Sequence, residues 1–299
     1  MEVFSVLKHI AKLWRSFQLP LLRSIPLDWY AENERRQQNI ARVCKTHKRG
    51  PWAKKRVQMN KSEFNNFFVD DIHKIVYCEV PKVGCSNWKR VYLVLTHNMK
   101  QDEAERTNQV FIHYKYANNL VRLVKYTSKG IEYRLQNYLK FMFVRHPLER
   151  IVSGYRDKLE DPDDIYQKTL GKYLLRKYRN ITTEDNNAGT TPTFSELVRY
   201  IISAKKLDVH FREYDQLCHP CDIPYDVIGK YETIDTDAAN IIKLIGASQE
   251  VSFPKSNGAG QTQKFVNKYL MRLNNTERSQ LWNRYRFDGR LFNYGYDFH

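Results

Sequence analysis

Apolar and polar positions in this chain follow a strand pattern first and a helix pattern directly afterwards. Residues 73–80 form a mostly apolar run rich in β-forming side chains, which predicts a buried strand. Pro81 ends this run, because it has no N–H to donate and it biases the preceding residue toward an extended conformation. From Asn87 onward the period becomes helical, with apolar side chains at Trp88, Val91, Tyr92 and Leu95. The pattern predicts a strand, a short loop and an amphipathic helix.

The same order of elements recurs further along the chain. Residues 140–145 predict a second short strand, and Pro147 stands where a helix would begin at its first position. The apolar face of that helix consists of Leu148, Ile151, Val152, Tyr155 and Leu159. A third buried strand is expected over 226–232, with further helices over 157–179, 193–204, 235–246 and 276–287. Alternating strands and helices favour an α/β fold with a parallel sheet covered on both faces.

The chain divides into an extension and one larger domain. Residues 1–63 have no strand pattern; they predict a polar helix over 28–46 and a basic linker over 45–55, which Gly50 and Pro51 interrupt. Residues 64–299 carry the strand and helix pattern of a catalytic domain, with polar loops over 180–192 and 255–263. We therefore predict a helical N-terminal extension, 1–63, followed by an α/β domain, 64–299.

The loop between the first strand and its helix has the properties of an anion site. Backbone N–H groups at a helix start have no partner within the helix, and the positive end of the helix dipole lies there. Lys82 adds a full positive charge, and Gly84 allows the backbone to approach a ligand closely. The spacing of a Walker A motif is absent, so ATP is not the first choice. The expected anion-binding residues are Pro81, Lys82, Val83, Gly84, Cys85, Ser86 and Asn87.

A second possible anion site follows the second strand. Arg145 stands at the strand end, and arginine is suited to a bidentate grip on phosphate. Ser153 lies six residues beyond Pro147, about 9 Å along the helix axis, and its hydroxyl offers a further donor. Two strand-loop-helix units with separate anion sites indicate a ligand with two anionic groups.

Five sequence blocks together resemble a known enzyme family. The segments VPKVGCSNWKR (80–90) and FVRHPLERIVSGYRDKLE (143–160) resemble the 5′-phosphosulfate and 3′-phosphate segments of the Golgi carbohydrate sulfotransferases. Three further segments fit the branch that contains the chondroitin and dermatan 4-O-sulfotransferases, the GalNAc-4-O-sulfotransferases and the glucuronyl 3-O-sulfotransferase: LCHPC (217–221), YDVIGKYETIDTDA (225–238) and LFNY (291–294). The resemblance covers about residues 69–299, with the blocks in the family's order.

The resemblance implies a sulfotransferase fold, in which a P-loop-like parallel sheet is flanked by helices. It further implies that the donor is 3′-phosphoadenosine 5′-phosphosulfate and that a sulfuryl group moves to a sugar hydroxyl, with no metal required. The first choice of acceptor is O-4 of GalNAc in chondroitin or dermatan; N-glycan GalNAc and terminal glucuronic acid are the alternatives. A kinase-like phosphotransferase would need Mg²⁺ ligands of Walker B type, which the sequence lacks. A glycan-binding protein without catalysis remains the non-enzymatic alternative.

The charge of the chain agrees with a polyanionic partner. The 299 residues contain 49 Lys+Arg and 33 Asp+Glu, a formal charge of +16, and 42% are hydrophobic, enough for a substantial core. The basic residues are scattered, and no helix-turn-helix, zinc-finger or RNA-binding signature is present. We therefore expect a sulfated or carboxylated glycan and no nucleic acid.

The general base is chosen from nine histidines and nearby carboxylates. His210 matches the histidine of the family's His-Trp pair, with Phe211 in place of tryptophan, and is our first candidate. Glu232 is the alternative. Related sequences carry Glu at the position of His146, which argues against that residue, and His219 lies between two cysteines and is expected to be structural.

Other residues in these segments have plainer interpretations. Cys85 is expected to be a small, fitting loop residue and not a nucleophile, because the loop lacks the glycines and arginine of a phosphatase cradle. Trp88 is expected to pack in the core, and Asn87 could simply cap its helix. Two sets of charged residues are expected at the surface: Arg150 and Arg156 in solvent, and Lys89 and Arg90 facing solvent or a glycan.

The cysteines and the sequons suggest an oxidising lumen. The chain has five cysteines, and the pair Cys218 and Cys221 predicts a local structural disulfide, since the second ligand pair of a zinc site is missing. Asn-x-Ser/Thr sequons stand at Asn60, Asn180 and Asn274.

The N-terminal region departs from the family, whose members are type II membrane proteins of the Golgi. Apolar runs such as 19–22 are interrupted by charges and fall short of the roughly 20 residues of a membrane span. A cleavable signal peptide is also absent. We expect a Golgi-luminal enzyme that meets the membrane only through an anchor upstream of this chain, the alternative being an amphipathic surface helix.

Overall fold

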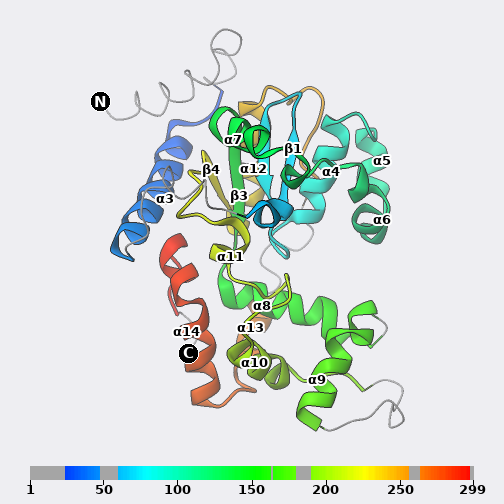
Figure 1. Cartoon of the computed structure of the whole chain (residues 1–299), viewed down its shortest axis with the longest axis vertical. Coiled ribbons are helices and arrows are strands. Elements are labelled where there is room, and N and C mark those ends of the chain that lie inside the picture. The colour runs from blue at the N-terminus through cyan, green and yellow to red at the C-terminus, as the bar shows by residue number, and fades with distance from the viewer. Residues whose placement is uncertain (1–23, 48–59, 163, 180–189, 256–262, 297–299) are drawn as a thin grey trace. The chain divides into compact units, whose positions relative to one another are not determined.

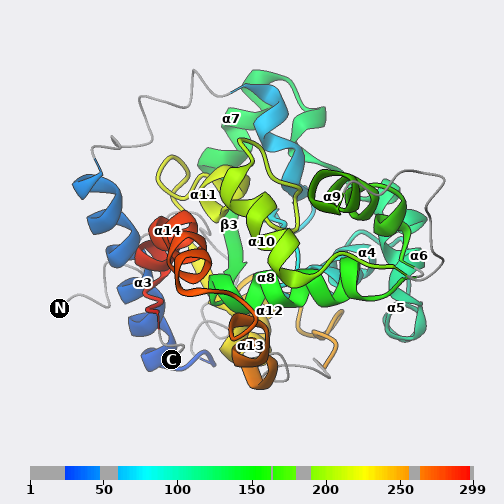
Figure 2. The same cartoon turned by 90° about the horizontal axis from the view of Figure 1, so that it is seen from below.

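The computed structural model describes residues 24–47, 60–162, 164–179, 190–255 and 263–296. Its contacts divide the chain into two compact units (Figures 1 and 2). The first unit comprises residues 1–144, 214–257 and 291–293, and the second comprises 145–213, 258–290 and 294–299. Two predicted loops, 180–192 and 255–263, and the linker 45–55 fall largely outside the described residues, as does Asn180.

The first unit contains a four-stranded sheet in the order β1-β2-β3-β4. Its strands are β1 (Phe67–Asp70), β2 (Ile75–Cys78), β3 (Leu139–Val144) and β4 (Val227–Lys230). Strands β2, β3 and β4 are parallel, as the alternating pattern predicts, whereas β1 pairs antiparallel with β2 through a tight connection. The predicted parallel sheet is therefore confirmed over β2 to β4, and β1 adds an antiparallel strand at one edge. The sequence analysis did not predict β1.

The first unit also contains helices. They are α3 (Leu27–Thr46), α4 (Cys85–Leu95), α5 (Gln101–Arg106), α6 (Gln109–Tyr114), α7 (Ser128–Asn137), α11 (Tyr214–Cys218) and α12 (Ile234–Leu244). Trp88 of α4 is fully buried against the aromatic rings of Tyr77 on β2 and of Phe141 and Phe143 on β3, which confirms its core position. Gly229 of β4 leaves room for the Phe143 ring, because a Cβ there would overlap that ring.

Helix α3 covers the open edge of the sheet, where β4 would otherwise leave backbone groups unpaired (Figure 1). Asn33 donates to the carbonyl of Asp226 over 2.8 Å and accepts from the N–H of Ile228 over 3.0 Å. Arg36 donates to the carbonyl of Ile228 over 2.8 Å, and Gln37 donates to the carbonyl of Asp226 over 2.8 Å. The predicted polar helix is thus confirmed, and its polar side chains complete the sheet in place of a fifth strand.

Two disulfides in the first unit join distant parts of the chain. Cys44 at the end of α3 is bonded to Cys221, and Cys78 on β2 is bonded to Cys218 at the end of α11. The disulfide-bonded state predicted for Cys218 and Cys221 is confirmed, but the local pairing is wrong. Each cysteine of the pair reaches a different element, 177 and 140 residues away, so sequence proximity did not indicate the partner.

The second unit is helical and has a core of its own. Its helices are α8 (Pro147–Tyr155), α9 (Leu170–Arg179), α10 (Phe194–Ser203) and α13 (Gln263–Leu270), together with most of α14 (Asn275–Phe292). Figure 2 shows α8, α10, α13 and α14 gathered together, and their apolar faces share one cluster. The five predicted apolar positions of α8 and its continuation, from Leu148 to Leu159, are all buried in that cluster.

Most predicted helices appear within two or three residues of their expected bounds. Pro147 begins α8, and Thr193 and Glu196 form the expected capping box of α10. The charged segment 157–179 is not one helix: α8 continues as a π-helical turn over Arg156–Glu160, a short 3₁₀ turn follows at Ile165–Lys168, and α9 comes after it. Along the described residues, no helix is both long and apolar enough to cross a membrane.

Candidate functional site

The loop after β2 adopts the conformation expected of an anion cradle. Lys82 and Gly84 both have left-handed backbone conformations, with φ of 71° and 87°, and α4 begins directly afterwards at Cys85. Glycine suits position 84 because a φ of 87° strains any residue with a side chain, and a Cβ there would also overlap the terminal methyl of Ile234 on α12. The backbone therefore turns sharply and presents the first N–H groups of α4 at the carboxyl edge of the sheet.

The donor set of this loop fits a phosphate-like group. The N–H groups of the first turn carry the positive end of the helix dipole, and the half-buried Lys82 supplies a charge beside them. Ser86, also half-buried, adds a hydroxyl in the first turn of α4. All seven loop residues expected to bind an anion, from Pro81 to Asn87, thus lie in one continuous turn of the first unit.

Cys85 has the environment of a structural residue. Its side chain is 8% exposed and takes no part in a disulfide. Burial raises the pKa of the Cys85 thiol, with the negative charge of Glu79 acting in the same direction. Since a thiolate is the nucleophilic form, this environment argues against covalent catalysis by Cys85.

Two polar residues of α4, Asn87 and Arg90, hold the start of the helix in place. Asn87 donates to the carbonyl of Pro254 over 3.1 Å and accepts from Arg90 over 3.2 Å. Arg90 also donates to the carbonyls of Ala104 and Thr107, both at 2.9 Å. Arg90 therefore connects α4 to the segment around α5. The prediction that Arg90 faces solvent or a glycan had solvent as one alternative, and the side chain is not directed there.

A histidine that the sequence analysis did not single out contacts the loop. Nε2 of His113, on α6, lies 2.8 Å from Oγ of Ser86, and its Nδ1 lies 2.8 Å from Nζ of Lys89. Lys89 is 4% exposed and forms an ion pair with Glu79, so the prediction that it faces solvent or a glycan is wrong. No local pattern marks His113, because it reaches the loop from a six-residue helix and lies 27 residues beyond Ser86 in the sequence.

The predicted second anion site lies in the other unit. Arg145 is 1% exposed and donates from Nε to the buried carboxylate of Glu149 over 3.0 Å. Ser153 is half-buried one helical turn beyond Glu149, on the same face of α8. The carboxylate of Glu149 was not anticipated, and it orients the guanidinium group of Arg145 from one side.

His210 also lies in the second unit, beside a carboxylate. Its Nδ1 is 2.8 Å from Oδ1 of Asp208, which also accepts the backbone N–H of His210 over 2.9 Å. Burial opposes ionisation of Asp208, but the hydrogen bonds from His210 lower the pKa of that carboxyl below its usual value. An ionised carboxylate at Nδ1 keeps the proton on that nitrogen and leaves Nε2 to act as a base.

The segment that carries His210 is anchored to α8 and α14. Arg150, completely buried, donates to the carbonyl of His210 over 3.1 Å and to that of Arg212. Tyr285 donates to the carbonyl of Phe211, whose ring packs against Gly154. The prediction of a solvated Arg150 is wrong, because its helical position faces the 208–213 segment and not solvent.

Two other base candidates differ sharply in environment. His146 is buried, its Nδ1 accepts the N–H of Leu148 over 3.2 Å, and its Nε2 donates to the carbonyl of Gly295 over 2.8 Å. Both ring nitrogens are thus engaged in structure. Glu232 is exposed in a 3₁₀ turn of the first unit after β4, whereas His210 belongs to the second unit.

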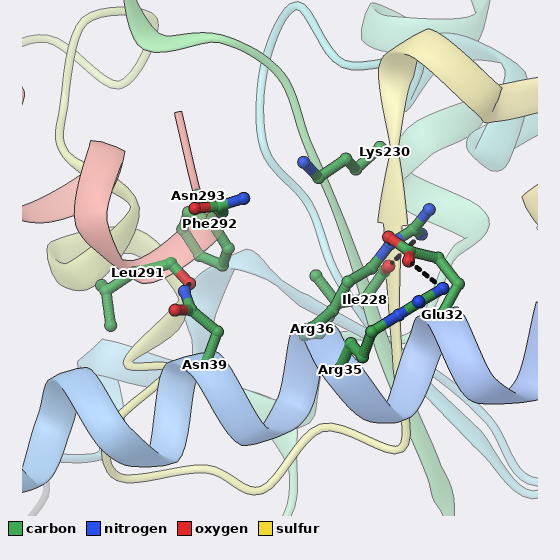
Figure 3. Close-up of a pocket in the computed structure, with 9 residues that line it drawn as sticks. All are labelled: Glu32, Arg35, Arg36, Asn39, Ile228, Lys230, Leu291, Phe292 and Asn293. Carbon is green, nitrogen blue, oxygen red and sulfur yellow. Dashed lines mark hydrogen bonds and ion pairs between the residues drawn. The ribbon is translucent and has the colours of Figure 1, made fainter. Parts of the chain in front are cut away.

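A cavity of about 280 Å³ lies in the first unit between α3, the end of β4 and residues 291–293 (Figure 3). Glu32 bridges Arg35 and Arg36 over 2.8 and 3.1 Å, and Arg36 also binds the buried Asp237. Lys230 also lines this cavity, and burial lowers its pKa. Glu32 and Asp237 offset much of the charge of Arg35 and Arg36. The cavity therefore resembles a structural contact between elements more than a second anion site.

Within the described ranges, no group of three or more His, Cys, Asp or Glu side chains is placed to hold a metal ion. A model described as the sulfotransferase family matches residues 65–295. This chain belongs to the sulfotransferase family. The match includes every residue of both predicted anion sites and His210.

The chain is similar to curated carbohydrate sulfotransferases, and the identity and coverage differ among three of them. It is 38% identical to carbohydrate sulfotransferase 9 of Homo sapiens over 77% of this chain and 53% of that protein. It is 34% identical to carbohydrate sulfotransferase 11 of Danio rerio over 88% of this chain and 76% of that protein, and 33% identical to carbohydrate sulfotransferase 14 of Danio rerio over 87% and 71%. The chain spans little more than half the length of the first of these relatives. No solved structure matches it.

Proposed function

We propose that this protein is a carbohydrate sulfotransferase that moves a sulfuryl group from 3′-phosphoadenosine 5′-phosphosulfate to a glycan hydroxyl. The family match over residues 65–295 is the observation that carries the proposal, and the sharply turned loop at Lys82 and Gly84 supports it. The named relatives are carbohydrate sulfotransferases, which supports a sugar acceptor.

The loop residues would hold the 5′ end of the donor. The donor supplies an activated sulfuryl group on a phosphate, and negative charge builds on that phosphate as the sulfuryl group leaves. In our proposal Lys82 and the N–H groups of residues 83–87 stabilise this charge, and Lys82 is the catalytic cation. Gly84 keeps the cradle open, and Ser86 adds a hydroxyl donor.

Arg145 and Ser153 are proposed to bind the 3′-phosphate. Arg145 offers a planar set of donors for a phosphate, and Glu149 holds that guanidinium group in one orientation. A mutation of Glu149 would therefore act on the donor indirectly, through Arg145. Ser153, on the same face of α8, would contribute one hydroxyl.

His210 is the proposed general base. As the sugar oxygen bonds to sulfur, the bond between sulfur and the bridging phosphate oxygen breaks, and the hydroxyl proton passes to Nε2 of His210. Adenosine 3′,5′-bisphosphate leaves with the electron pair of the broken bond. The Asp208 carboxylate at Nδ1 stabilises the imidazolium that forms, and base catalysis of this kind contributes about 10²–10⁴-fold.

We propose O-4 of GalNAc in chondroitin or dermatan as the acceptor position, with N-glycan GalNAc or terminal glucuronic acid as alternatives. A formal charge of +16 favours a polyanionic glycan over a neutral one. The same charge would attract nucleic acid, but the sequence contains no nucleic-acid-binding motif. A protein that binds glycans without catalysis would carry the same charge, so only transfer of sulfate distinguishes it from an enzyme.

A Golgi-luminal location is part of the proposal. The two disulfides between distant elements support an oxidising compartment. Asn60 and Asn274, the two described sequon positions, are both exposed and so accessible to glycosylation. Attachment to the membrane would be as a type II protein. We further propose that residues 64–299 form the catalytic domain and that the preceding extension, which contains α3, completes its sheet.

The decisive experiment is transfer of labelled sulfate from the donor to a panel of desulfated chondroitin, desulfated dermatan and N-glycan acceptors. Incorporation into chondroitin or dermatan at O-4 of GalNAc is the expected result. Incorporation confined to N-glycans or to glucuronic acid would move the acceptor assignment to those alternatives. Glycan binding with no transfer to any acceptor, under conditions where the donor binds, would refute the enzymatic proposal.

A further inference from the structure

Ser86, His113, Lys89 and Glu79 form a continuous polar chain that ends in the anion cradle. The Glu79 carboxylate pairs with Nζ of Lys89, Nζ lies 2.8 Å from Nδ1 of His113, and Nε2 of His113 lies 2.8 Å from Oγ of Ser86. Lys89 is 4% exposed, and the other three residues are half-buried. The four residues come from α6, from α4 and from the loop before α4, all in the first unit.

The chemistry of Lys89 determines the protonation of the histidine. A lysine ammonium group can only donate hydrogen bonds, so Nδ1 of His113 must accept. On a neutral ring the proton then resides on Nε2, and Nε2 donates to Oγ of Ser86. A positive charge at 2.8 Å also opposes a second proton on the ring, which favours this neutral tautomer.

The tautomer of His113 determines the orientation of the Ser86 hydroxyl. Oγ of Ser86 has one proton, and once that oxygen accepts from His113 its own hydrogen must point elsewhere. Ser86 is in the first turn of α4, where the N–H groups of the cradle are also presented. A hydroxyl held as a donor fits the acceptor oxygens of a phosphosulfate, whereas a freely rotating hydroxyl would be oriented only on binding.

We propose that His113 is a positioning residue, which fixes the Ser86 hydroxyl as a hydrogen-bond donor to the 5′-phosphate group of the donor nucleotide. The inference rests on the proposed function, because it assumes that this loop binds that group. Lys89 and Glu79 set the tautomer of His113, and the effect of His113 on the ligand passes through Ser86.

A double-mutant cycle tests the route of this effect. Calorimetry with adenosine 3′,5′-bisphosphate would compare the full chain with His113→Ala, Ser86→Ala and the double variant. We expect each single change to weaken binding about five- to tenfold, the loss of roughly one hydrogen bond, and the double variant to lose little more than Ser86→Ala alone. His113→Gln, which can still donate from its amide, should recover most of the affinity, and His97→Gln on an exposed residue serves as the control.

Three results would overturn the proposal. Losses that multiply in the double variant would show that His113 acts independently of Ser86. Unchanged nucleotide affinity with a large fall in turnover for His113→Gln would make His113 a base acting on the acceptor. A histidine ¹⁵N NMR spectrum with the proton on Nδ1, or on both nitrogens at neutral pH, would contradict the assigned tautomer even if the protein binds no nucleotide. Failure of the wild-type chain to bind nucleotide with the expected tautomer present would instead refute only the proposed function on which the inference rests.

Discussion

The side-chain amide of Asn33 on α3 pairs with the backbone of β4, accepting the N–H of Ile228 over 3.0 Å while donating to the carbonyl of Asp226 over 2.8 Å. One side chain thus satisfies a donor and an acceptor at the edge of a sheet, in the manner of a neighbouring strand. Asn33 is 4% exposed, so water would not readily replace these bonds.

Replacing Asn33 by alanine should therefore destabilise the protein. The N–H of Ile228 would be left without its partner in a buried place, whereas the carbonyl of Asp226 would keep its hydrogen bond from Gln37. We expect a loss of about 1–3 kcal/mol in the free energy of unfolding. Urea denaturation followed by circular dichroism measures this quantity. Gln38→Ala, on an exposed position of the same helix, should change stability by less than about 0.5 kcal/mol. Equal stability of the two variants would mean that α3 does not complete the sheet.

The disulfides should contribute strongly to stability because they close long loops. The paired change Cys44→Ser with Cys221→Ser opens a link across 177 residues, for which the chain-entropy estimate is about 5 kcal/mol as an upper value. Thermal unfolding should shift downward in this variant and on addition of a reductant to the wild type. Cys85→Ala, which removes a cysteine outside any disulfide, is the matched control, and it should still show the shift with reductant.

Local patterns in the sequence predicted the elements better than their long-range partners. The apolar periods at 73–95 and 140–159 are strong, since each buried face repeats over several turns, and β2, α4, β3 and α8 all appear there. The strand-loop-helix order around Lys82 and Gly84 was predictable for the same reason, because all of it lies in one short stretch of sequence. The antiparallel β1 was not predicted, and its three apolar residues stand between the polar pairs 65–66 and 70–71.

Tertiary contacts explain what the sequence could not indicate. Arg150 looks like a surface residue of a helix, yet it is buried because carbonyls of a segment 60 residues away receive its guanidinium group. Lys89 is buried for a comparable reason, since the carboxylate of Glu79 compensates its charge and His113 accepts a hydrogen bond from it. The sequence around a polar side chain does not indicate whether that side chain binds a distant backbone group or charge. The partners of the cysteines could not be predicted for the same reason.

Lys82→Ala and Arg145→Ala should each weaken binding of adenosine 3′,5′-bisphosphate by at least about tenfold, because each removes a cation from an anionic group. Isothermal titration calorimetry is the measurement, with Lys100→Ala on an exposed position as the control. Undiminished binding in both variants would refute the proposal of two anion sites.

Sulfate transfer should also persist in excess chelator; strong inhibition would favour a metal-dependent phosphotransferase.

The turn between β1 and β2 should make stability depend on pH. The hydrogen bond to Asp70 raises the pKa of His73 above its usual value, although burial acts in the opposite direction. A group with a raised pKa in the folded state contributes fully below its unfolded pKa of about 6.5, and this contribution is lost as pH rises through the folded pKa. The wild type should therefore lose stability relative to His73→Gln as pH rises from about 6 to 9, measured by thermal unfolding. A difference between the two proteins that stays constant over this range would contradict the assignment.

His210→Ala should lower turnover by about 10²–10⁴-fold while leaving affinity for adenosine 3′,5′-bisphosphate nearly unchanged, since a base acts on the acceptor hydroxyl and not on the nucleotide. Asp208→Asn should also reduce turnover, because an amide cannot stabilise the imidazolium as the carboxylate at Nδ1 does. Steady-state kinetics with saturating donor, paired with calorimetry, separates these effects, and His97→Ala controls for loss of an exposed histidine. If turnover of His210→Ala stays within a few-fold of the wild type, His210 is not the base. Glu232→Gln then becomes the next variant to measure, because an exposed carboxylate after β4 is the remaining candidate from the sequence.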